Sequence, residues 1–388
     1  MTTLTLRPGE EWRLLMGQRA VYAGEVAQIE GELMAGGVAD VRSAQGRFLG
    51  RGLLSPASKI LLRILTREPQ DIDRAFFKDR LQQAWAYRLM LGEVDSCRVV
   101  FGDADGLPGL TVDKFGQVLS IQTLTVGMEQ RKELLCDLLE ELFSPDAIYE
   151  RNDVKVREKE GLAQQKGLIR GVLPQELLIR ENGFLIKVDV AEGQKTGSYL
   201  DQRENHAAIA PYVAGRRVLD VCCCTGGFGL HAAGYGAKHV TSVDISSAAL
   251  AQAEENYARN HLTNVDFVQA DVFDLLRAYE KEGRRFDMVI LDPPAFCKNK
   301  SALQKAYKGY KEINLRALRL LPKGGILVTN SCSHYMTPAL FWDMLQQAAV
   351  DAGVELRLIE QRMQSRDHPV TLGDEQSLYL KCFILEVM

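Results

Sequence analysis

The sequence lacks the features that mark secreted, membrane and zinc-binding proteins. Its apolar stretches fall well short of the roughly 18 residues that a membrane span needs, and the opening MTTLTLRPGEEW has no basic segment followed by an apolar one. Eight cysteines are present, three of them adjacent at 222–224, without disulfide-like spacing or two CxxC pairs. We therefore expect a cytoplasmic protein with no membrane partner and no metal site.

A strong net charge is also missing. The chain has 388 residues and a net charge of −4, with 46% hydrophobic and 25% charged residues, as in soluble globular proteins. This length indicates two or three domains. The charge is uneven, however, because residues 41–67 contain no acid and six basic side chains, namely Arg42, Arg47, Arg51, Lys59, Arg63 and Arg67. Such a run attracts a phosphate backbone; the alternative is a solvated strand face balanced by acids elsewhere.

Three segments differ in their hydrophobic patterns. Residues 1–73 alternate apolar and polar positions between glycine turns, which predicts a β-rich domain. Residues 74–190 combine helical spacing with strands and a hairpin turning at Asn182-Gly183, which predicts an α+β domain. In residues 191–388, near-continuous apolar strands alternate with helices. This predicts an α/β, doubly wound parallel sheet, closed by an antiparallel pair of strands at one edge.

The GxGxxG pattern of dinucleotide-binding enzymes is absent from the first strand-to-helix turn of this sheet, where Asp220 precedes Gly226 and Gly227. An acid there suits a ligand with a cationic or amine-bearing end. Asp244 and Asp271 follow the next two strands, where carboxylates can accept hydrogen bonds from a ribose and from an adenine amino group. We therefore predict S-adenosylmethionine as the cofactor, the alternative being that each aspartate caps a helix. The predicted contacts are Asp220, Cys224, Thr225, Gly226, Gly227, Asp244, Ile245, Asp271, Val272 and Asp292.

The fourth and fifth strands end in groups suited to a planar base. The fourth leads into DPPAF at 292–296, where two prolines stiffen a loop carrying a carboxylate and an aromatic ring. The fifth leads into SCSHYM, which places Cys332 near Asp292 because these strands are expected to be neighbours. A thiolate adding to C6 of a pyrimidine makes C5 nucleophilic enough to accept a methyl group. The alternatives are a core-filling role for Cys332, Cys297 as the nucleophile, and a surface position rather than a base for His334.

These residues belong to a longer set of motifs that resembles bacterial 23S ribosomal RNA cytosine-C5 methyltransferases with an N-terminal PUA domain. The motifs, in chain order, are GRGLLSPASKILLRILT, DADGLPGLTVDKFG, GQKTGSYLDQRENH, LDVCCCTGGFG, VDIS, DPPAF, GYKEINLRAL, SCSHYM and DHPV. The resemblance covers nearly the whole chain. It implies a PUA-like domain at 1–73, an α+β middle domain at 74–190 and a class I, Rossmann-like methyltransferase domain at 191–388.

The resemblance also assigns roles to individual residues. It implies that Cys332 is the nucleophile and that Asp292 lies at the target base. It adds cofactor contacts in QKTGSYLDQR, namely Lys195, Thr196, Gly197 and Arg203. Ribosomal RNA is the implied partner, and we predict RNA contacts from Arg42, Arg47, Arg51, Lys59, Pro293 and Phe296. Formation of a homodimer is left open.

The sequence departs from the family pattern, for example in the CCC run at 222–224, where the family usually has varied residues. Ala20 stands where a Trp is expected in the PUA-like module, and Cys297 usually has no cysteine counterpart, which leaves a second catalytic thiol open. Other functions also stay open: a uracil-C5 or an exocyclic-amine RNA methyltransferase, or a non-catalytic RNA-binding protein with a degenerate methyltransferase fold. DPPAF fits uracil less well, and methylation of an exocyclic amine needs no thiol.

Overall fold

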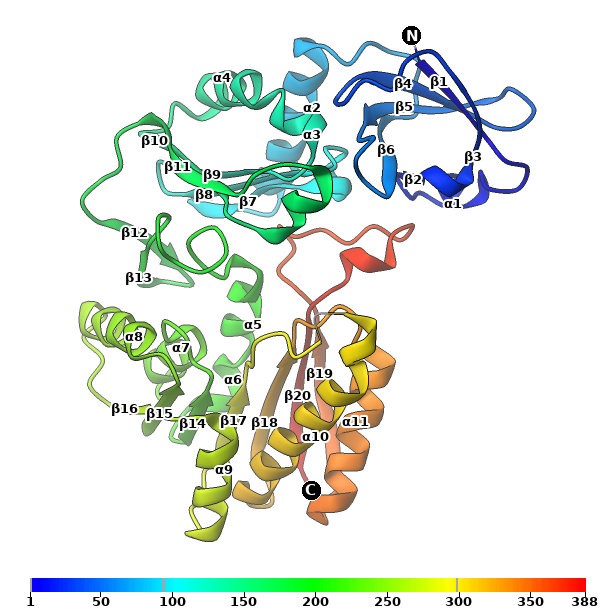
Figure 1. Ribbon diagram of the computed structural model, residues 1–388. Coiled ribbons are helices and arrows are strands. Elements are labelled where there is room, and N and C mark those ends of the chain that lie inside the picture. Colours follow the sequence, from blue (N-terminus) through cyan, green and yellow to red (C-terminus); the bar gives the residue numbers. More distant parts are fainter. Residues whose placement is uncertain (1, 93–94, 298) are drawn as a thin grey trace. The chain divides into compact units, whose positions relative to one another are not determined.

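The computed structural model describes residues 2–92, 95–297 and 299–388 (Figure 1). The chain forms two compact units. The first comprises Met1–Ile179, Val188–Leu200 and Arg366–Ser377, and the second comprises Arg180–Lys187, Asp201–Ser365 and Leu378–Met388. Within the described ranges, no helix is both long and apolar enough to cross a membrane.

The first unit begins with the β-rich part that the sequence predicts. Its six-stranded sheet has the order β2-β6-β5-β4-β1-β3. The elements are β1 (Thr2–Leu6), α1 (Trp12–Leu15), β2 (Ala20–Tyr22), β3 (Val26–Glu30), β4 (Val38–Arg42), β5 (Phe48–Leu54) and β6 (Ile60–Thr66). Alternating apolar side chains such as Leu4, Leu6 and Leu62 form a core cluster of their own. Gly52 is required on β5, because a Cβ there would lie 2.0 Å from the carbonyl oxygen of Arg63.

The remainder of the first unit is the predicted α+β part. Its five-stranded sheet has the order β11-β10-β9-β8-β7, in which β9 and β10 are parallel. The elements are α2 (Arg74–Met90), β7 (Ser96–Phe101), β8 (Leu110–Phe115), β9 (Val118–Thr123), α3 (Val126–Glu129), α4 (Lys132–Phe143), β10 (Ala147–Asn152) and β11 (Gln165–Gly171). Helix α2 is capped by Asp73, whose side chain accepts from the Phe76 amide at 3.0 Å. It buries Phe77 and Leu81 in a core shared with the strands.

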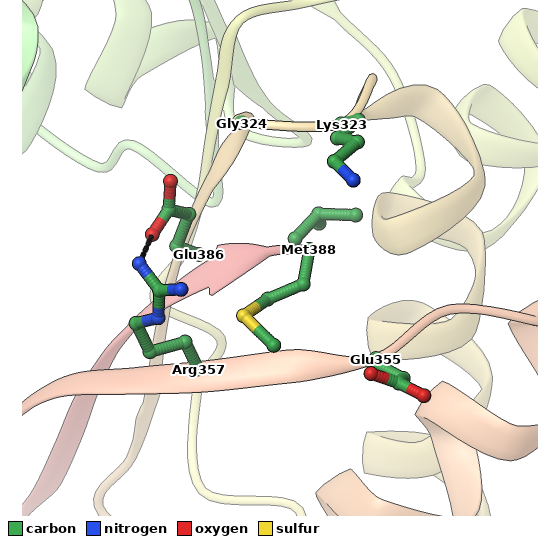
Figure 2. Close-up of a pocket in the computed structure, with 7 residues that line it drawn as sticks. Lys323, Gly324, Glu355, Arg357, Glu386 and Met388 are labelled. Atoms are coloured by element: carbon green, nitrogen blue, oxygen red, sulfur yellow. Dashed lines mark hydrogen bonds and ion pairs between the residues drawn. The ribbon is translucent and has the colours of Figure 1, made fainter.

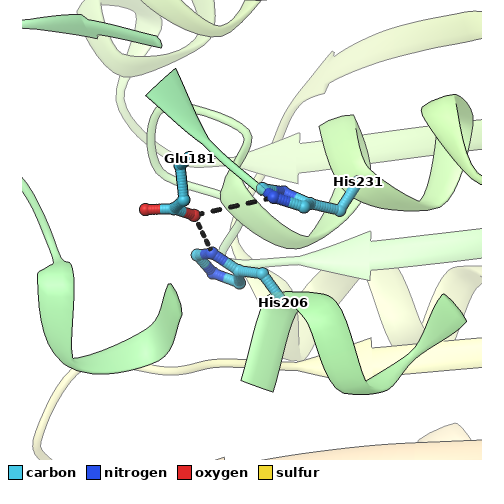
Figure 3. Close-up of side chains that lie close together, drawn as sticks. All are labelled: Glu181, His206 and His231. Carbon is cyan, nitrogen blue, oxygen red and sulfur yellow. Dashed lines mark hydrogen bonds and ion pairs between the residues drawn. The ribbon is translucent and has the colours of Figure 1, made fainter. Parts of the chain in front are cut away.

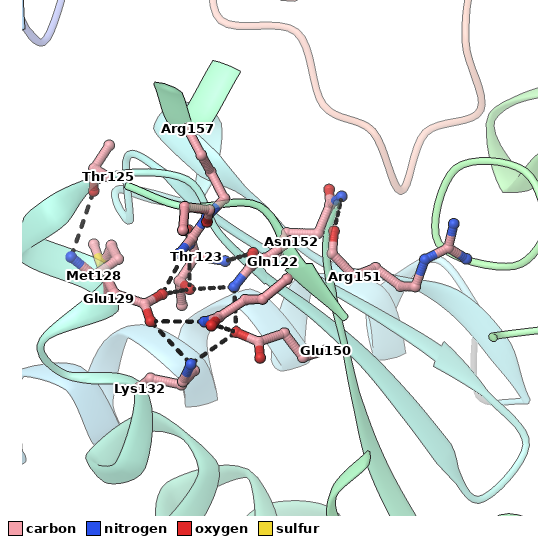
Figure 4. Close-up of polar contacts among 12 residues, drawn as sticks. Gln122, Thr123, Thr125, Met128, Glu129, Lys132, Glu150, Arg151, Asn152 and Arg157 are labelled. Atoms are coloured by element: carbon pink, nitrogen blue, oxygen red, sulfur yellow. Dashed lines mark hydrogen bonds and ion pairs between the residues drawn. The ribbon is translucent and has the colours of Figure 1, made fainter. Parts of the chain in front are cut away.

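A network of charged side chains cross-links helices and strands within this part (Figure 4). Glu129 receives hydrogen bonds from Arg157 at 2.8 Å and from Lys132 at 2.9 Å, and Lys132 also reaches Glu150 at 2.8 Å. Burial alone would raise the pKa of Glu129, but the hydrogen bonds from Arg157, Thr123 and Lys132 outweigh it and lower the pKa to about 2. Every buried charge here has an opposite partner, so the network is explained by structure alone.

The hairpin predicted at Asn182-Gly183 is confirmed. It joins β12 (Leu177–Glu181) to β13 (Phe184–Val188), and both turn residues have positive φ, 49° and 94°, as a two-residue hairpin turn requires. The division between the compact units falls inside β12, so the turn belongs to the second unit. The three domain ranges expected from the sequence stay predictions.

The second unit is built on a seven-stranded sheet with the order β16-β15-β14-β17-β18-β20-β19. The strands are β14 (Arg217–Val221), β15 (His239–Asp244), β16 (Val265–Gln269), β17 (Met288–Leu291), β18 (Ile326–Ser331), β19 (Leu356–Arg362) and β20 (Lys381–Val387). The first five pair in parallel, and β20 is antiparallel to both β18 and β19. The predicted doubly wound sheet with an antiparallel edge pair is confirmed.

Helices cover this sheet, as near-continuous apolar strands require. They are α5 (Arg203–Ala208), α6 (Ala210–Val213), α7 (Gly227–Gly234), α8 (Ser247–Arg259), α9 (Val272–Lys281), α10 (Leu303–Leu320) and α11 (Pro338–Ala352). Helices α9, α10 and α11 contact one another in sequence and share one core cluster with β17 and β18 (Figure 1). The strand order reverses between β14 and β17, so the carboxyl ends of these two strands flank the topological switch point where such sheets bind ligands.

Candidate active site

The turn after β14 holds its backbone in a rarely populated conformation. Cys222 and Cys224 have φ of 60° and 50°, and Gly226 has φ of 90°. Non-glycine residues with positive φ are strained, and such residues cluster at functional sites. The Cys224 amide donates to Asp244 Oδ2 at 2.9 Å, and α7 begins directly after this turn at Gly227. This hydrogen bond therefore joins the turn after β14 to the end of β15 and stabilises the strained backbone of the turn.

Asp220, at the end of β14, is fully buried. Its Oδ2 accepts from the Gly229 amide at 2.8 Å, whereas its Oδ1 is buried and has no hydrogen-bond partner among the described residues. Burial raises the pKa of Asp220 to about 7, and the nearby negative charges of Asp292 and Asp244 add to the rise that the Gly229 hydrogen bond opposes. A buried carboxylate oxygen without a partner at a switch point suits a ligand that brings a positive charge.

The other two predicted acids differ in what holds them. Asp244 accepts from the Cys224 amide through one oxygen and from the Ser246 amide, at 2.9 Å, through the other. Ser246 itself caps α8, as predicted, so Asp244 is not the helix cap. Asp271 is exposed and caps α9, its Oδ1 accepting from the Phe273 amide at 2.8 Å, and its contact with the cofactor stays a prediction. Beside these acids, Ile245 is 66% exposed, an apolar side chain left open at the carboxyl edge of the sheet.

The carboxylate of Asp292 and the thiol of Cys332 follow neighbouring strands, as predicted. Strands β17 and β18 pair in parallel, and the Cys332 Sγ lies 4.0 Å from the carbonyl oxygen of Pro293. Asp292 Oδ1 accepts from Gln202 Nε2 at 2.9 Å, and Gln202 is in turn held by Asn205 at 2.7 Å. Gln202 was not among the predicted site residues, although it lies in the QKTGSYLDQR motif that supplied four of them.

A serine next to the thiol joins the two loops. The Cys297 amide donates to Ser333 Oγ at 3.1 Å, and the Tyr310 hydroxyl lies 2.9 Å from the same oxygen. The Phe296 ring packs on Tyr310 with centroids 4.6 Å apart. Pro293 is buried and Phe296 half-buried, so packing accounts for both side chains, and their contacts with RNA stay predictions.

Comparison with known proteins identifies two parts of the chain. Residues 169–374 match the family of S-adenosylmethionine-dependent methyltransferases, and residues 4–67 match a PUA-like domain. Ribosomal RNA large subunit methyltransferase I of Escherichia coli O139:H28 is 45% identical over 392 aligned residues, which cover 99% of each chain. The chain belongs to this family of methyltransferases. The protein of the same name from Klebsiella pneumoniae (strain 342) is 44% identical, over 99% of this chain and 98% of its own.

Solved structures agree with the fold of this methyltransferase. The structure of SMU.776 complexed with SAH matches over 100% of both chains with a TM-score of 0.86 at 23% identity. A SAM-dependent methyltransferase candidate from Streptococcus mutans matches over 100% of both chains with a TM-score of 0.84 at 22% identity. At these identities the likeness shows the fold alone. The predicted class I methyltransferase domain with an N-terminal PUA-like part is confirmed.

The methyltransferase uses S-adenosylmethionine, and the residues after β14 fit this cofactor. The unpartnered oxygen of Asp220 suits its ammonium group, and the glycine turn leaves room for a ligand to approach the backbone. The start of α7 itself is tightly packed. A Cβ on Gly229 would lie 2.7 Å from Asp220 Oδ2, and one on Gly227 would lie 2.6 Å from the His206 ring. Which side chains contact the cofactor stays a prediction.

The cysteines of the methyltransferase unit are not equivalent. Burial raises the pKa of Cys224 to about 11 and those of Cys222 and Cys382 further still. Cys297 is 3% exposed and its thiol donates to the Asn299 carbonyl at 3.2 Å. Cys332, by contrast, is half-buried at the end of a strand. Its position suits a nucleophile better than that of Cys297 does.

The predicted cofactor contacts in QKTGSYLDQR are divided between the two units. Lys195, Thr196 and Gly197 belong to the first, where Thr196 is buried and its hydroxyl donates to Asp113. Arg203 starts α5 in the methyltransferase unit and is 6% exposed. A contact between the first three residues and the cofactor stays a prediction.

The basic run at 41–67 needs one correction. Arg51 was expected to face RNA, but it is buried and its guanidinium bonds Asp40 at 2.7 Å and the Gln70 carbonyl at 2.8 Å. It is a structural residue of the β4–β5 pair. Arg47 and Lys59 are exposed and Arg42 is half-buried, and no ion pair is found for these three among the described residues. They remain the predicted RNA contacts of the PUA-like part.

A second polar cluster lies beneath the glycine turn, where Glu181, His206 and His231 bring ligand-type atoms within 4.8 Å of one another (Figure 3). Hydrogen bonds account for these atoms. His206 Nδ1 lies 2.7 Å from Glu181, His231 Nδ1 lies 2.7 Å from the Gly227 carbonyl, and Asn182 lies 3.1 Å from His231 Nε2. Burial lowers the pKa of His231 to about 4, which keeps it neutral. The cluster ties the hairpin turn to the start of α7, and the absence of a metal site stays a prediction.

A pocket of about 480 Å³ lies at the other end of the seven-stranded sheet (Figure 2). Lys323 and Gly324 line it from the turn before β18, and Arg357 and Glu386, paired at 3.1 Å, line it from β19 and β20. Ligands of doubly wound sheets bind at the carboxyl ends of the parallel strands, whereas this pocket lies at their amino ends. We therefore assign this pocket no part in methyl transfer.

Proposed function

We propose that this methyltransferase transfers a methyl group to C5 of a cytosine in large-subunit (23S) ribosomal RNA, through a covalent bond between Cys332 and C6 of the base. The relatives that match over nearly their full length are named for ribosomal RNA of the large subunit. The observation that carries the chemistry is the thiol of Cys332 beside the loop that bears Asp292. Methylation at C5 requires this thiol, because C5 of a pyrimidine is a poor nucleophile until the thiol has added to C6.

Each residue has a distinct task in this mechanism. S-adenosylmethionine, when bound, supplies the methyl group as an electrophile. Cys332 loses its proton to solvent and adds to C6, which makes C5 nucleophilic. Asp292, held by Gln202, accepts hydrogen bonds from the amino group of the cytosine and from N3, which takes up a proton from solvent. The protonated ring then receives the electron pair of the thiolate as C6 is attacked, and N3 releases its proton when Cys332 leaves. After methylation a base removes the C5 proton, the C6–S bond breaks and Cys332 leaves as the thiolate.

The stiff proline loop supports the positioning of the base. Ser333 bonds the Cys297 amide, so the loop bearing Asp292 and the loop bearing Cys332 are joined directly. A preorganised pair of this kind reduces the cost of bringing base and nucleophile together. The same geometry favours methylation of C5 over methylation of an exocyclic amine, because the second reaction needs no thiol.

The test compares Cys332→Ala with Cys297→Ala as a matched control on the same pair of loops. The full chain is incubated with radiolabelled S-adenosylmethionine and 23S ribosomal RNA, and 5-methylcytosine is quantified by mass spectrometry. We expect Cys332→Ala to lose at least about 1000-fold of the methylation rate and Cys297→Ala to keep the chemistry. RNA carrying 5-fluorocytosine should trap a covalent complex with the wild type and Cys297→Ala only, because its C5 carries fluorine in place of the proton that must be removed before the C6–S bond breaks.

Retained methylation by Cys332→Ala would exclude the covalent mechanism and favour methylation of an exocyclic amine. A product of 5-methyluridine would assign the uracil alternative. A protein that binds S-adenosylmethionine weakly or not at all in calorimetry would support the non-catalytic alternative. Cytoplasmic location and dimer formation stay predictions that this experiment does not address.

A further inference from the structure

A buried lysine lies behind the thiol loop. Lys381 opens β20, is 2% exposed and pairs with Ser331 in the antiparallel β18–β20 ladder. Its Nζ donates to the carbonyl oxygens of Ser333 at 2.7 Å and of Tyr379 at 2.8 Å. An ammonium group has three N–H donors, and across the described residues no carboxylate pairs with it and the third donor has no acceptor. The positive charge is therefore buried beside the residue that follows Cys332, without a counter-ion among the described residues.

We propose that Lys381 is a positioning residue for Cys332, whose ammonium fixes the backbone that follows the thiol and supplies the positive charge that stabilises the thiolate. The inference rests on the proposed function, since it takes Cys332 to be the nucleophile. Lys381 keeps its proton throughout the cycle. The thiol proton goes to solvent, the negative charge passes into the ring as the C–S bond forms, and it returns to sulfur when that bond breaks.

Packing alone does not explain a lysine at this position. The residues that follow it on β20, Cys382, Phe383 and Ile384, are fully buried and mostly apolar. Two carbonyl hydrogen bonds could equally be made by a neutral glutamine, without the cost of burying a charge. That cost is visible in the group itself, because burial lowers the pKa of Lys381 to about 8. The charge of Cys332 acts in the opposite direction and raises it.

The surroundings of the thiol otherwise oppose ionisation. Asp292 precedes Pro293, whose carbonyl oxygen lies 4.0 Å from Cys332 Sγ, and a carboxylate there opposes a thiolate. Tyr310 on α10 is a neutral phenol whose pKa burial raises. Cys297 and Cys382 are buried thiols on the neighbouring segments. Of the groups named here, Lys381 is the cation, and its charge favours a thiolate. An opposite charge within a few ångströms lowers a pKa by about 1 to 3 units.

The test measures the thiol directly, in the full chain and without RNA. Alkylation of Cys332 by iodoacetamide is followed by mass spectrometry of its peptide as a function of pH, in the wild type and in three variants of Lys381. Lys381→Gln keeps hydrogen-bond donors without charge, Lys381→Met removes both, and Lys381→Arg keeps the charge. Lys323→Met is the matched control, because Lys323 precedes the opposite end of β18. Circular dichroism and S-adenosylmethionine binding confirm that each variant folds.

We expect Lys381→Gln and Lys381→Met to slow alkylation of Cys332 at about pH 7 by about tenfold, with Lys381→Arg and Lys323→Met close to the wild type. The wild-type advantage over Lys381→Gln should shrink as the pH rises past about 8, where Lys381 loses its proton, while Lys381→Arg should keep it.

Three results would overturn the inference: a Lys381→Gln profile identical to the wild type, a Lys381→Arg variant as slow as Lys381→Gln, or a wild-type Cys332 whose thiol titrates above about pH 9. The last result needs no variant, so misfolding cannot leave the inference untested. Failure of the proposed function is distinguishable, because it would appear as methylation by Cys332→Ala whatever the alkylation profiles show.

Discussion

Affinity for S-adenosylmethionine is predicted to depend on pH through Asp220. This carboxyl is fully buried, its Oδ1 has no hydrogen-bond partner in the part of the chain that the structure describes, and burial raises its pKa to about 7. A cofactor with an ammonium group binds the ionised form, so binding lowers the pKa. Affinity is then highest above about pH 7 and falls as the pH drops below this value. The loss is about tenfold, or 1.4 kcal/mol, per pH unit. At about pH 5 the loss reaches about 100-fold.

Calorimetry between about pH 5 and pH 8 measures this slope, with S-adenosylmethionine and with an analogue that lacks the α-amino group. We expect the slope only for the amine-bearing ligand. Asp220→Asn should bind weakly at every pH, whereas Asp271→Asn, a change at an exposed helix cap, should keep the wild-type slope. A dissociation constant that stays flat over this range for the wild type would refute the assignment of Asp220 to the cofactor's ammonium group.

Three further changes test other parts of the structure. Arg47→Ala should weaken RNA binding and reduce the slope of log affinity against log salt concentration by about 1. Arg51→Ala should instead lower the free energy of unfolding by about 3 kcal/mol, because it leaves Asp40 buried alone. Equal effects of the two variants on RNA binding would contradict this difference. Relative to His231→Gln, the wild type should lose up to about 3 kcal/mol of stability as the pH drops from 6.5 toward 4, because His231 takes up its proton less readily in the folded than in the unfolded state. The variant is the reference because Asp220, whose pKa burial raises, acts in the opposite direction in both proteins; equal pH dependences of the two proteins in thermal denaturation would contradict this. Ser333→Ala should reduce the methylation rate while leaving S-adenosylmethionine affinity unchanged, since it separates the thiol loop from the Cys297 amide; loss of cofactor affinity would indicate general misfolding instead.

The sheet and the ends of its strands could be predicted because they follow from local rules. Alternation of apolar strands with helices fixes a parallel sheet, and the carboxyl ends of parallel strands share an edge. Asp220, Asp292 and Cys332 were found in this way, and the structure places all three at strand ends. The same rules could not show that Asp271 caps a helix, because a carboxylate that follows a strand has the same sequence pattern whether it caps the next helix or contacts a ligand.

Residues that reach the site across long stretches of sequence were missed. Gln202 bonds Asp292 from 90 positions away, and Lys381 bonds Ser333 from 48 away, so no spacing rule connects them. Arg51 was a different error, since its partner was within reach of sequence reasoning. Asp40 lies one position before the acid-free run, and antiparallel pairing of β4 with β5 sets it directly opposite Arg51.

The protein treats its buried charges in two ways, and the contrast bears on function. In the first unit, Glu129 is paired with Arg157 and Lys132, and its pKa moves down. In the methyltransferase unit, Asp220 and Lys381 have no ion pair among the described residues, and burial moves both pKa values toward the neutral form, by amounts worth about 4 and 3 kcal/mol. Stability alone would select against such charges. Each lies where the proposed reaction brings the opposite charge, namely the cationic cofactor at Asp220 and the thiolate at Lys381. The free energy of burying an unpaired charge destabilises the resting protein, and pairing of that charge stabilises the reacting state relative to it.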